Sequence, residues 1–206
     1  MDEYKTVKQS LSASVVIERS KFIASVKSVA SAEEANAFIE SVKKEYSDAT
    51  HNPYAYITER GGYSKFSDDG EPSGTSGAPI LESIKAAGLK DTCVVVTRYF
   101  GGIKLGTGGL ARAYGGAASD VLKAAGSVRR CLSFICKATL PYDKQNLFPK
   151  IGIGLGKILK IDYLDNIVFE FAIKSDSFEE FTASFKDALK GKYEIEVLYK
   201  DYIDLD

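Results

Sequence analysis

Glycine is concentrated in one part of this chain. Thirteen of the 18 glycines lie between Gly61 and Gly116, within a sequence of 206 residues. Glycine adopts backbone angles that other residues avoid, and it lets another group approach the backbone closely. Most of these glycines fall in two strings, SDDGEPSGTSG at 67–77 and TRYFGGIKLGTGGLARAYG at 97–115. We therefore expect two loops at which a ligand or another segment comes close to the backbone.

Composition and charge limit the classes of function. Hydrophobic residues make up 45% and charged residues 27% of the chain, which is enough apolar material for a sizeable core. The formal net charge is -1, so the chain lacks the overall basic field of non-specific nucleic-acid binders. Any nucleic-acid site must be a local patch. Acidic residues outnumber basic ones after residue 130, so we expect RNA less in that part.

The metal-ligating residue types are few. Cys93, Cys131 and Cys136 are an odd number of thiols with no CxxC pair, and His51 is the only histidine. Neither a disulfide framework nor a four-ligand zinc site is expected, and we predict no metal and no cofactor. The first ten residues contain no apolar run, and no stretch approaches the ~18 apolar residues of a membrane span. We predict a cytoplasmic protein without membrane contact.

The hydrophobic pattern predicts the elements of the first half. Alternation over residues 4–29 predicts a β-meander, and Ser31 with Glu34 forms a capping box that begins a helix. The β-branched run at 91–99 is typical of a central strand buried on both faces, which would make Cys93 a core residue. The other predicted segments are a strand at 53–58, a long loop at 59–77, a helix at 78–87, a glycine-rich loop at 101–109 and a helix at 110–125.

The second half has a different pattern. Strands are predicted at 130–140, 157–163, 167–174 and 193–199, with helical content at 143–155 and a helix at 178–189. Ser177 and Glu180 form a second capping box for that helix. The order βαββαβ is that of a ferredoxin-like domain. We predict an α+β protein with one domain over residues 1–128 and a ferredoxin-like domain over residues 129–206.

Two motifs resemble a known family. DDGEPSGT, followed by VTRYFGGIKLGTGGL and then Arg-Ala-Tyr-Gly, is similar to the signature of the YigZ/IMPACT family. The resemblance covers most of residues 1–125. It implies a first domain with the fold of ribosomal protein S5 domain 2 and a second that resembles domain V of elongation factor G. It also implies a role in translation, because the family's eukaryotic branch is associated with translational control through a ribosome-associated partner.

The second glycine string is the candidate phosphate site. A glycine-rich turn that leads into a helix N-terminus presents free amide groups and a positive dipole end to an anion. The string matches neither a Walker A loop nor a dinucleotide fingerprint. The candidate phosphate-binding or nucleic-acid-binding residues are Arg98, Tyr99, Gly101, Gly102, Lys104, Gly106, Thr107, Gly108, Gly109 and Arg112. The aromatic rings in this string could stack on bases or fill the core.

The first string allows several interpretations. Its residues are Asp68, Asp69, Gly70, Glu71, Pro72, Ser73, Gly74 and Thr75. Its acids could pair with Arg98 and Arg112, hold a hard cation, or act as general acid and base with His51 as proton carrier. The catalytic candidates are thus His51, Asp69 and Glu71. His51 could instead complement the dipole of the preceding helix.

Two classes of function follow from these residues and the resemblance. The first is a translation-associated regulatory protein that binds nucleic acid, with RNA as the favoured class, or a ribosome-associated partner through the basic glycine loop. The second is an enzyme that acts on a small phosphorylated or acidic metabolite through the acidic loop. A third alternative is a protein-interaction module without catalysis. We favour a non-enzymatic role over catalysis, and the sequence leaves the oligomeric state open.

Overall fold

A computed structural model describes residues 3–58, 62–146, 150 and 155–204. The chain divides into two compact units, one formed by Lys5–Val128 and the other by Arg129–Asp206 with Met1–Tyr4. Each unit combines helices with a β-sheet, so the protein is a two-unit α+β chain.

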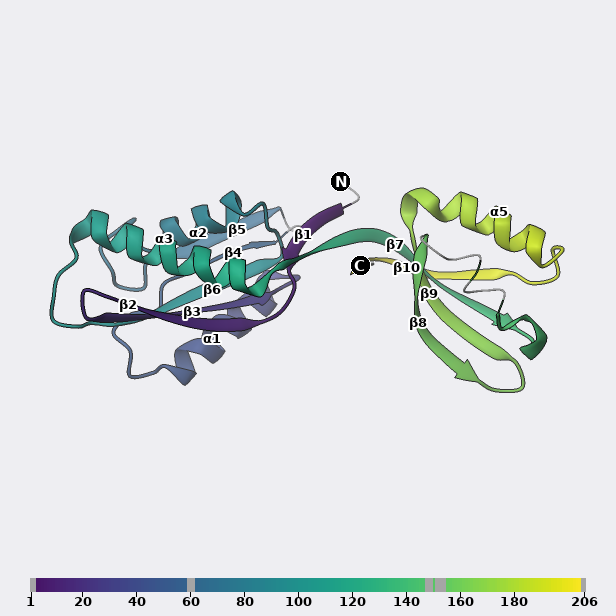
Figure 1. The fold of residues 1–206 in the computed structure, drawn as a ribbon, viewed down its shortest axis with the longest axis horizontal. Helices are drawn as coiled ribbons and strands as arrows, with labels where there is room; N and C mark the ends of the chain where they lie inside the picture. Colours follow the sequence, from purple (N-terminus) through teal and green to yellow (C-terminus); the bar gives the residue numbers. More distant parts are fainter. Residues whose placement is uncertain (1–2, 59–61, 147–149, 151–154, 205–206) are drawn as a thin grey trace. The chain divides into compact units, whose positions relative to one another are not determined.

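The first unit contains a five-stranded antiparallel sheet. Its strand order is β2-β3-β6-β4-β5. The strands are β2 (Leu11–Ile17), β3 (Ser20–Ser28), β4 (Tyr54–Thr58), β5 (Tyr63–Ser67) and β6 (Thr92–Tyr99). Its helices are α1 (Ala32–Glu45), α2 (Gly77–Ala86) and α3 (Gly106–Ala125). Helix α1 covers one face of the sheet, and α2 with α3 cover the other (Figure 1).

Strand β6 is the centre of this three-layer arrangement. Val94 and Val96 pack in the core beneath α2 and α3, whereas Cys93 and Val95 pack in the core beneath α1. All four side chains are fully buried. The prediction of a central strand buried on both faces is therefore confirmed, and so is Cys93 as a core residue. Burial raises the pKa of its thiol well above the usual value.

The second unit is built on another sheet. Strands follow the order β1-β7-β9-β8, and β10 also pairs with β7. The pairs β7–β9, β8–β9 and β7–β10 are antiparallel. The bounds are β1 (Glu3–Val7), β7 (Ser127–Leu140), β8 (Gly156–Tyr163), β9 (Ile167–Lys174), α5 (Phe178–Ala188) and β10 (Ile195–Asp204). Phe169 and Phe171 of β9 pack against Phe181 and Phe185 of α5 in one core.

The β-meander predicted for residues 4–29 is wrong in its first strand. Strands β2 and β3 form a hairpin, but β1 belongs to the sheet that contains β7. An alternating pattern specifies that a segment is a strand with one buried face, and it does not specify which strand becomes its neighbour.

Two other boundaries differ from the prediction. The loop expected at 59–77 contains the edge strand β5, whose side chains are mostly exposed and so give no hydrophobic alternation. Helix α3 begins at Gly106 rather than at residue 110. Glycine has low helix propensity, and here tertiary packing of the following residues outweighs that propensity. Gly106, Thr107, Gly108 and Gly109 therefore belong to the first turn of a helix, not to a loop.

The two predicted capping boxes have different outcomes. At α1 the Glu34 amide donates to Ser31 Oγ at 3.2 Å, and Glu34 Oε2 accepts from the Ala30 amide at 2.9 Å. At α5 no side chain caps the N-terminus, because Ser177 Oγ donates to Asp176 instead. The helical content expected at 143–155 lies largely outside the described residues, apart from a short 3-10 turn at Tyr142–Lys144.

Candidate functional site

Asp68 organises the acidic loop ahead of α2. Its Oδ1 accepts hydrogen bonds from the Ser76 amide at 3.0 Å, the Ser76 hydroxyl at 2.7 Å and the Gly77 amide at 2.9 Å. Its Oδ2 accepts from the Gly74 amide at 2.8 Å. Partial burial opposes ionisation, but these donors outweigh it and lower the pKa of Asp68. The carboxylate thus satisfies free amides where α2 begins, which is a structural role.

Asp69 joins the same loop to α1 and to the segment before β4. Its Oδ1 lies 2.8 Å from Lys43 Nζ, and its Oδ2 accepts from the Asn52 amide at 2.7 Å. Burial works against the charge, and the bonds from Lys43 and Asn52 outweigh burial, so the pKa of Asp69 is lowered. The hydrogen bond to Asp69 likewise raises the pKa of Lys43.

His51 lies beside this loop rather than at a helix end. Its Nδ1 is 2.8 Å from the Asp69 carbonyl oxygen, and a Cβ at Gly70 would come within 3.1 Å of the same nitrogen. Its backbone bridges to Arg98 of β6. Helix α1 ends at Glu45, so the dipole interpretation of His51 is not supported. His51 and Asp69 do come together, through a backbone carbonyl rather than the carboxylate.

Glu71 lies in a buried polar cluster with Arg98 and Tyr114. Its Oε1 accepts from an Arg98 guanidinium nitrogen at 2.6 Å and from the Tyr114 hydroxyl at 2.7 Å. Arg98 is 5% exposed, and its guanidinium lies over the rings of Phe22 and Phe100. Burial, together with the bond to Glu71, raises the pKa of Tyr114. The pairing of Arg98 with a loop acid that we considered from the sequence is what the structure contains.

Arg98 therefore does not lie with the other two cations of the glycine string. Lys104 and Arg112 are exposed, whereas Arg98 is enclosed beneath the loop. The sequence places all three within fifteen residues, but alternation along β6 puts Arg98 on the same face as Val94 and Val96, which packs beneath α2 and α3. Tyr99 donates its hydroxyl to Asp48 at 2.8 Å, and Phe100 is exposed.

The glycine loop passes tightly over the β2–β3 turn. A Cβ at Gly101 would lie 2.1 Å from the carbonyl carbon and oxygen of Arg19, so no larger residue fits there without displacement. The Gly101 amide donates to Ser20 Oγ at 3.2 Å. Gly102 and Gly106 have positive φ and open space around them. Gly101 is thus required by close packing within the chain and not by a ligand.

The first turn of α3 is open to solvent. Gly106, Thr107 and Gly108 are exposed, no side chain caps this end, and the turn contains no acidic residue. A Cβ at Gly108 would lie 3.5 Å from an Arg112 guanidinium nitrogen, so Arg112 lies back over this turn. Among the described residues, neither Lys104 nor Arg112 takes part in an ion pair.

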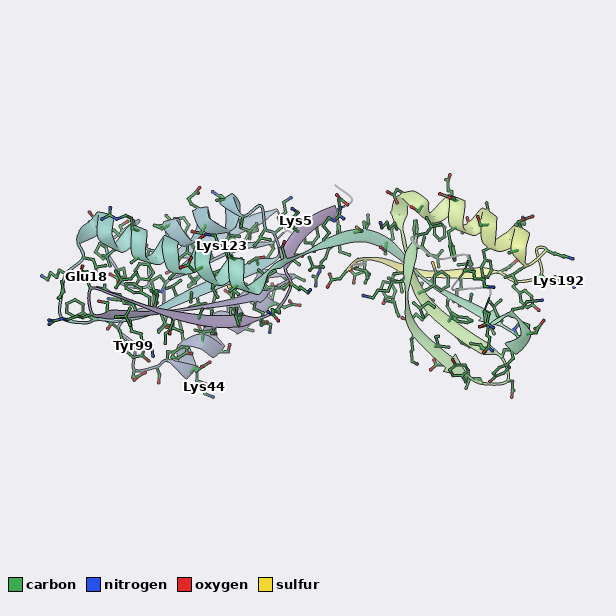
Figure 2. The ribbon with its side chains drawn as sticks, in the orientation of Figure 1. Lys5, Glu18, Lys44, Tyr99, Lys123 and Lys192 are labelled. Carbon is green, nitrogen blue, oxygen red and sulfur yellow. The ribbon has the colours of Figure 1, made fainter. Side chains whose placement is uncertain are left out.

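A pocket of about 510 Å³ opens beside this turn. Its lining residues are Ile17, Glu18, Ile103, Lys104, Leu105, Gly109, Arg112 and Ala113. Glu18 is its one acidic residue and lies in the β2–β3 turn; Figure 2 shows Glu18 and Tyr99 toward the same end of this unit. The pocket thus contains two cations that form no ion pair among the described residues, and it lies next to the exposed first turn of α3. These features favour an anion, and the Glu18 carboxylate opposes one.

Sequence reasoning missed several participants. Lys43, Asn52 and Tyr114 hold the acidic loop, and Ile17 and Glu18 line the pocket. Tyr114 stands in the second glycine string, but the sequence did not indicate its bond to Glu71, and Lys43, Ile17 and Glu18 carry no local signal for their roles. Pro72 accepts from the Thr75 hydroxyl at 2.7 Å within a turn that also contains Ser73. In the described part of the chain, no group of three or more His, Cys, Asp or Glu is placed to hold a metal ion. No helix in the described ranges has the length and apolar character to cross a bilayer.

Known proteins resemble this chain along most of its length. A family profile described as the Impact N-terminal domain matches residues 18–122. The "IMPACT family member YvyE" of Bacillus subtilis is 41% identical over 95% of this chain and 91% of its own. The "IMPACT family member YigZ" of Escherichia coli is 35% identical over 87% of this chain and 90% of its own. A crystal structure of a hypothetical protein superposes with a TM-score of 0.65 at 30% identity, covering 97% of this chain and 98% of that one.

Proposed function

This chain belongs to the IMPACT family, and from that premise we propose that it is a translation-associated protein whose first unit binds RNA phosphate at the first turn of α3. The observation that carries the proposal is the pair of exposed cations Lys104 and Arg112, which form no ion pair within the described part of the chain and lie beside a helix N-terminus that no side chain caps there. Backbone amides and the positive end of the helix dipole favour an anion there. The translation setting rests on the family resemblance.

The contact set differs from the one expected from the sequence. Lys104, Arg112 and the amides of Gly106, Thr107 and Gly108 are accessible to a phosphate. Arg98 supports the loop from beneath through its ion pair with Glu71, and in this proposal it does not contact the phosphate. Glu18 opposes an anion in the same pocket, so this is a site for one or two phosphates and not a broad basic surface.

An exposed aromatic ring, four residues before Lys104 in the sequence, supports RNA over a small phosphorylated compound. Phe100 is 48% exposed and already stacks with the buried Arg98 guanidinium on one side. An exposed ring in the same segment as a proposed phosphate site offers a stacking surface for an unpaired base. The loop carboxylates of Asp68, Asp69 and Glu71 are engaged in structural bonds, and no observation favours the enzymatic alternative.

We also propose the fold assignments of the two units. The order β10-β7-β9-β8, with α5 between β9 and β10, supports a ferredoxin-like fold for the predicted domain over residues 129–206. The layered first unit supports an S5 domain 2-like fold for the predicted domain over residues 1–128. These proposed likenesses to domains of the translation machinery are analogies of fold, and fold alone does not identify a ligand.

A salt titration of RNA binding tests the site. We expect log affinity to fall linearly with log salt, and Lys104→Glu combined with Arg112→Glu to reduce the slope by about 0.7 for each lost contact to a single strand. The matched control is Lys44→Glu combined with Lys123→Glu, two exposed lysines of the same unit that do not line the pocket and that Figure 2 labels away from Glu18. The control should retain the wild-type slope.

Two results would count against the proposal. If the site variant retains wild-type affinity and slope, the first turn of α3 does not contact RNA. If both double variants lose affinity equally, binding depends on overall charge. The site variant can also be used in a pull-down from RNase-treated lysate. If it still retains a ribosomal protein, the result instead supports a protein partner at another surface.

A further inference from the structure

Strand β2 forms one edge of the first unit's sheet, and the middle of the strand is exposed. It pairs with β3 on one side, and among the described residues no strand pairs with its other side. Five consecutive residues, from Ser12 to Val16, are exposed. Val16 is 67% and Val15 36% exposed (Figure 1 shows β2 at the margin of the sheet).

This edge lacks the features that protect sheet edges. Natural edge strands carry charges, prolines, bulges or covers that prevent pairing with another chain. The sequence LSASVVI contains neither charge nor proline, and its register with β3 is unbroken over all seven residues. The opposite edge, β5, is shorter and carries the exposed Lys65 at its centre. The edge formed by β5 is therefore protected against pairing with another chain, whereas the edge formed by β2 is not.

The hairpin geometry shows which backbone groups of β2 face outward. Ile17 and Ser20 flank a two-residue turn in which Glu18 and Arg19 both have positive φ, as a type I′ turn requires. The flanking pair of such a turn is hydrogen-bonded, and antiparallel pairs alternate along the strand. The amides and carbonyls of Ser12, Ser14 and Val16 therefore point away from β3.

We propose that β2 is a self-pairing edge, which joins β2 of a second copy in antiparallel register centred on Ser14. In this register Ser14 lies opposite Ser14 of the partner subunit, and Ser12 lies opposite Val16 of the partner subunit. All three residues that direct backbone groups outward are then used on both chains. The two β2 strands join the five-stranded sheets into one continuous sheet.

The charge pattern favours a second copy as the occupant. Neutral residues run from Gln9 to Ile17 in a chain that is 27% charged, so two copies of this strand pair without opposing like charges. Lys8 precedes this neutral run, and Glu18 and Arg19 follow it. Antiparallel pairing therefore brings Lys8 of each chain toward the turn of the other chain, where the charges of Glu18 and Arg19 cancel. A seven-residue strand pair falls well short of a standard interface of about 1,600 Å², so the dimer is weak and concentration-dependent.

A charge-swap experiment in sedimentation equilibrium tests the proposal. The full chain is studied up to concentrations above about 100 μM, as a small interface requires. We expect wild type to dimerise, and Ser14→Lys and Ser14→Glu each to raise the dissociation constant at least about tenfold, because like charges meet at the two-fold axis. An equimolar mixture of the two variants should restore the dimer. Ser64→Lys on the protected edge β5 is the matched control and should behave as wild type.

The mixture keeps the test independent of folding defects, because only folded chains regain association. Circular dichroism verifies that each variant alone retains its secondary structure. Wild type that remains monomeric at the highest concentration overturns the proposal. A dimer that persists equally in Ser14→Lys also overturns it, because that dimer uses another surface.

Discussion

Glu71 and Arg98 form a buried ion pair in the first unit. Their side chains are 3% and 7% exposed, and Glu71 Oε1 lies 2.6 Å from an Arg98 guanidinium nitrogen. Arg98 Nε is buried without a hydrogen-bond partner among the described residues, so the pair with Glu71 carries most of the compensation for burying this charge. Through Tyr114, the same oxygen also connects the acidic loop to α3.

Removal of the Glu71 carboxylate should destabilise the first unit strongly. Glu71→Ala leaves Arg98 buried and unpaired, and we expect a loss of about 3–5 kcal/mol in unfolding free energy. Hydrogen exchange of the β6 amides measures this unit by itself. Glu82→Ala, which removes the exposed partner of Lys85, is the control and should cost less than about 1 kcal/mol. Equal effects of the two substitutions would contradict the importance of the buried pair.

Tyr114→Phe should have a smaller effect than Glu71→Ala. It removes one hydrogen bond to a charged acceptor and leaves the Arg98 pair in place, so we expect a loss of about 1–3 kcal/mol. A double-mutant cycle with Glu71→Gln should show coupling, since both side chains share one oxygen. Strictly additive effects, measured by the same hydrogen exchange, would show that the hydroxyl contributes independently of Glu71.

Acid should weaken the acidic loop before other parts of the first unit. Folding lowers the pKa values of Asp68 and Asp69 below their ordinary value of 3.8. The two carboxylates therefore stabilise the folded chain fully above pH 3.8, and this stabilisation is lost as the pH falls through their lower folded pKa values. We expect Asp68→Asn to cost about 1–3 kcal/mol at neutral pH. The difference from wild type should shrink below pH 3.8.

Unfolding curves recorded across that pH range provide the measurement. Asp120→Asn alters an exposed aspartate of α3 and should remain close to wild type at every pH. A deficit in Asp68→Asn that stays constant down to the lowest pH would mean that the charge of Asp68 does not contribute.

Two glycine substitutions should have opposite effects. Gly101→Ala places a methyl group against the Arg19 backbone and must displace the β2–β3 turn, so we expect it to destabilise by about 1–3 kcal/mol. Gly116 lies within α3 with open space around it, and Gly116→Ala should stabilise by up to about 1 kcal/mol. Thermal unfolding of the two variants compares them directly. A neutral Gly101→Ala would show that the turn yields easily.

Local patterns identified most of the elements. The β-branched run of β6, the capping box of Ser31 and Glu34, and the helical spacing of Phe181 and Phe185 each depend on residues close together in sequence. The partner of β1 and the strand β5 were not predictable in this way. Strand partners are chosen by packing across the whole unit, and an exposed edge strand carries no hydrophobic alternation.

The candidate site was likewise predictable from the sequence only in part. The two glycine strings and their charged residues could be located in the sequence by themselves, because glycine density and resemblance to the IMPACT family are properties of the sequence. Only the tertiary structure decided that Arg98 is enclosed by Phe22, Phe100 and Glu71 while Lys104 and Arg112 remain exposed. The physical reason is that burial depends on which distant segments fold over a side chain, and the contacts of Arg98 with Phe22 and Glu71 join residues more than twenty positions apart.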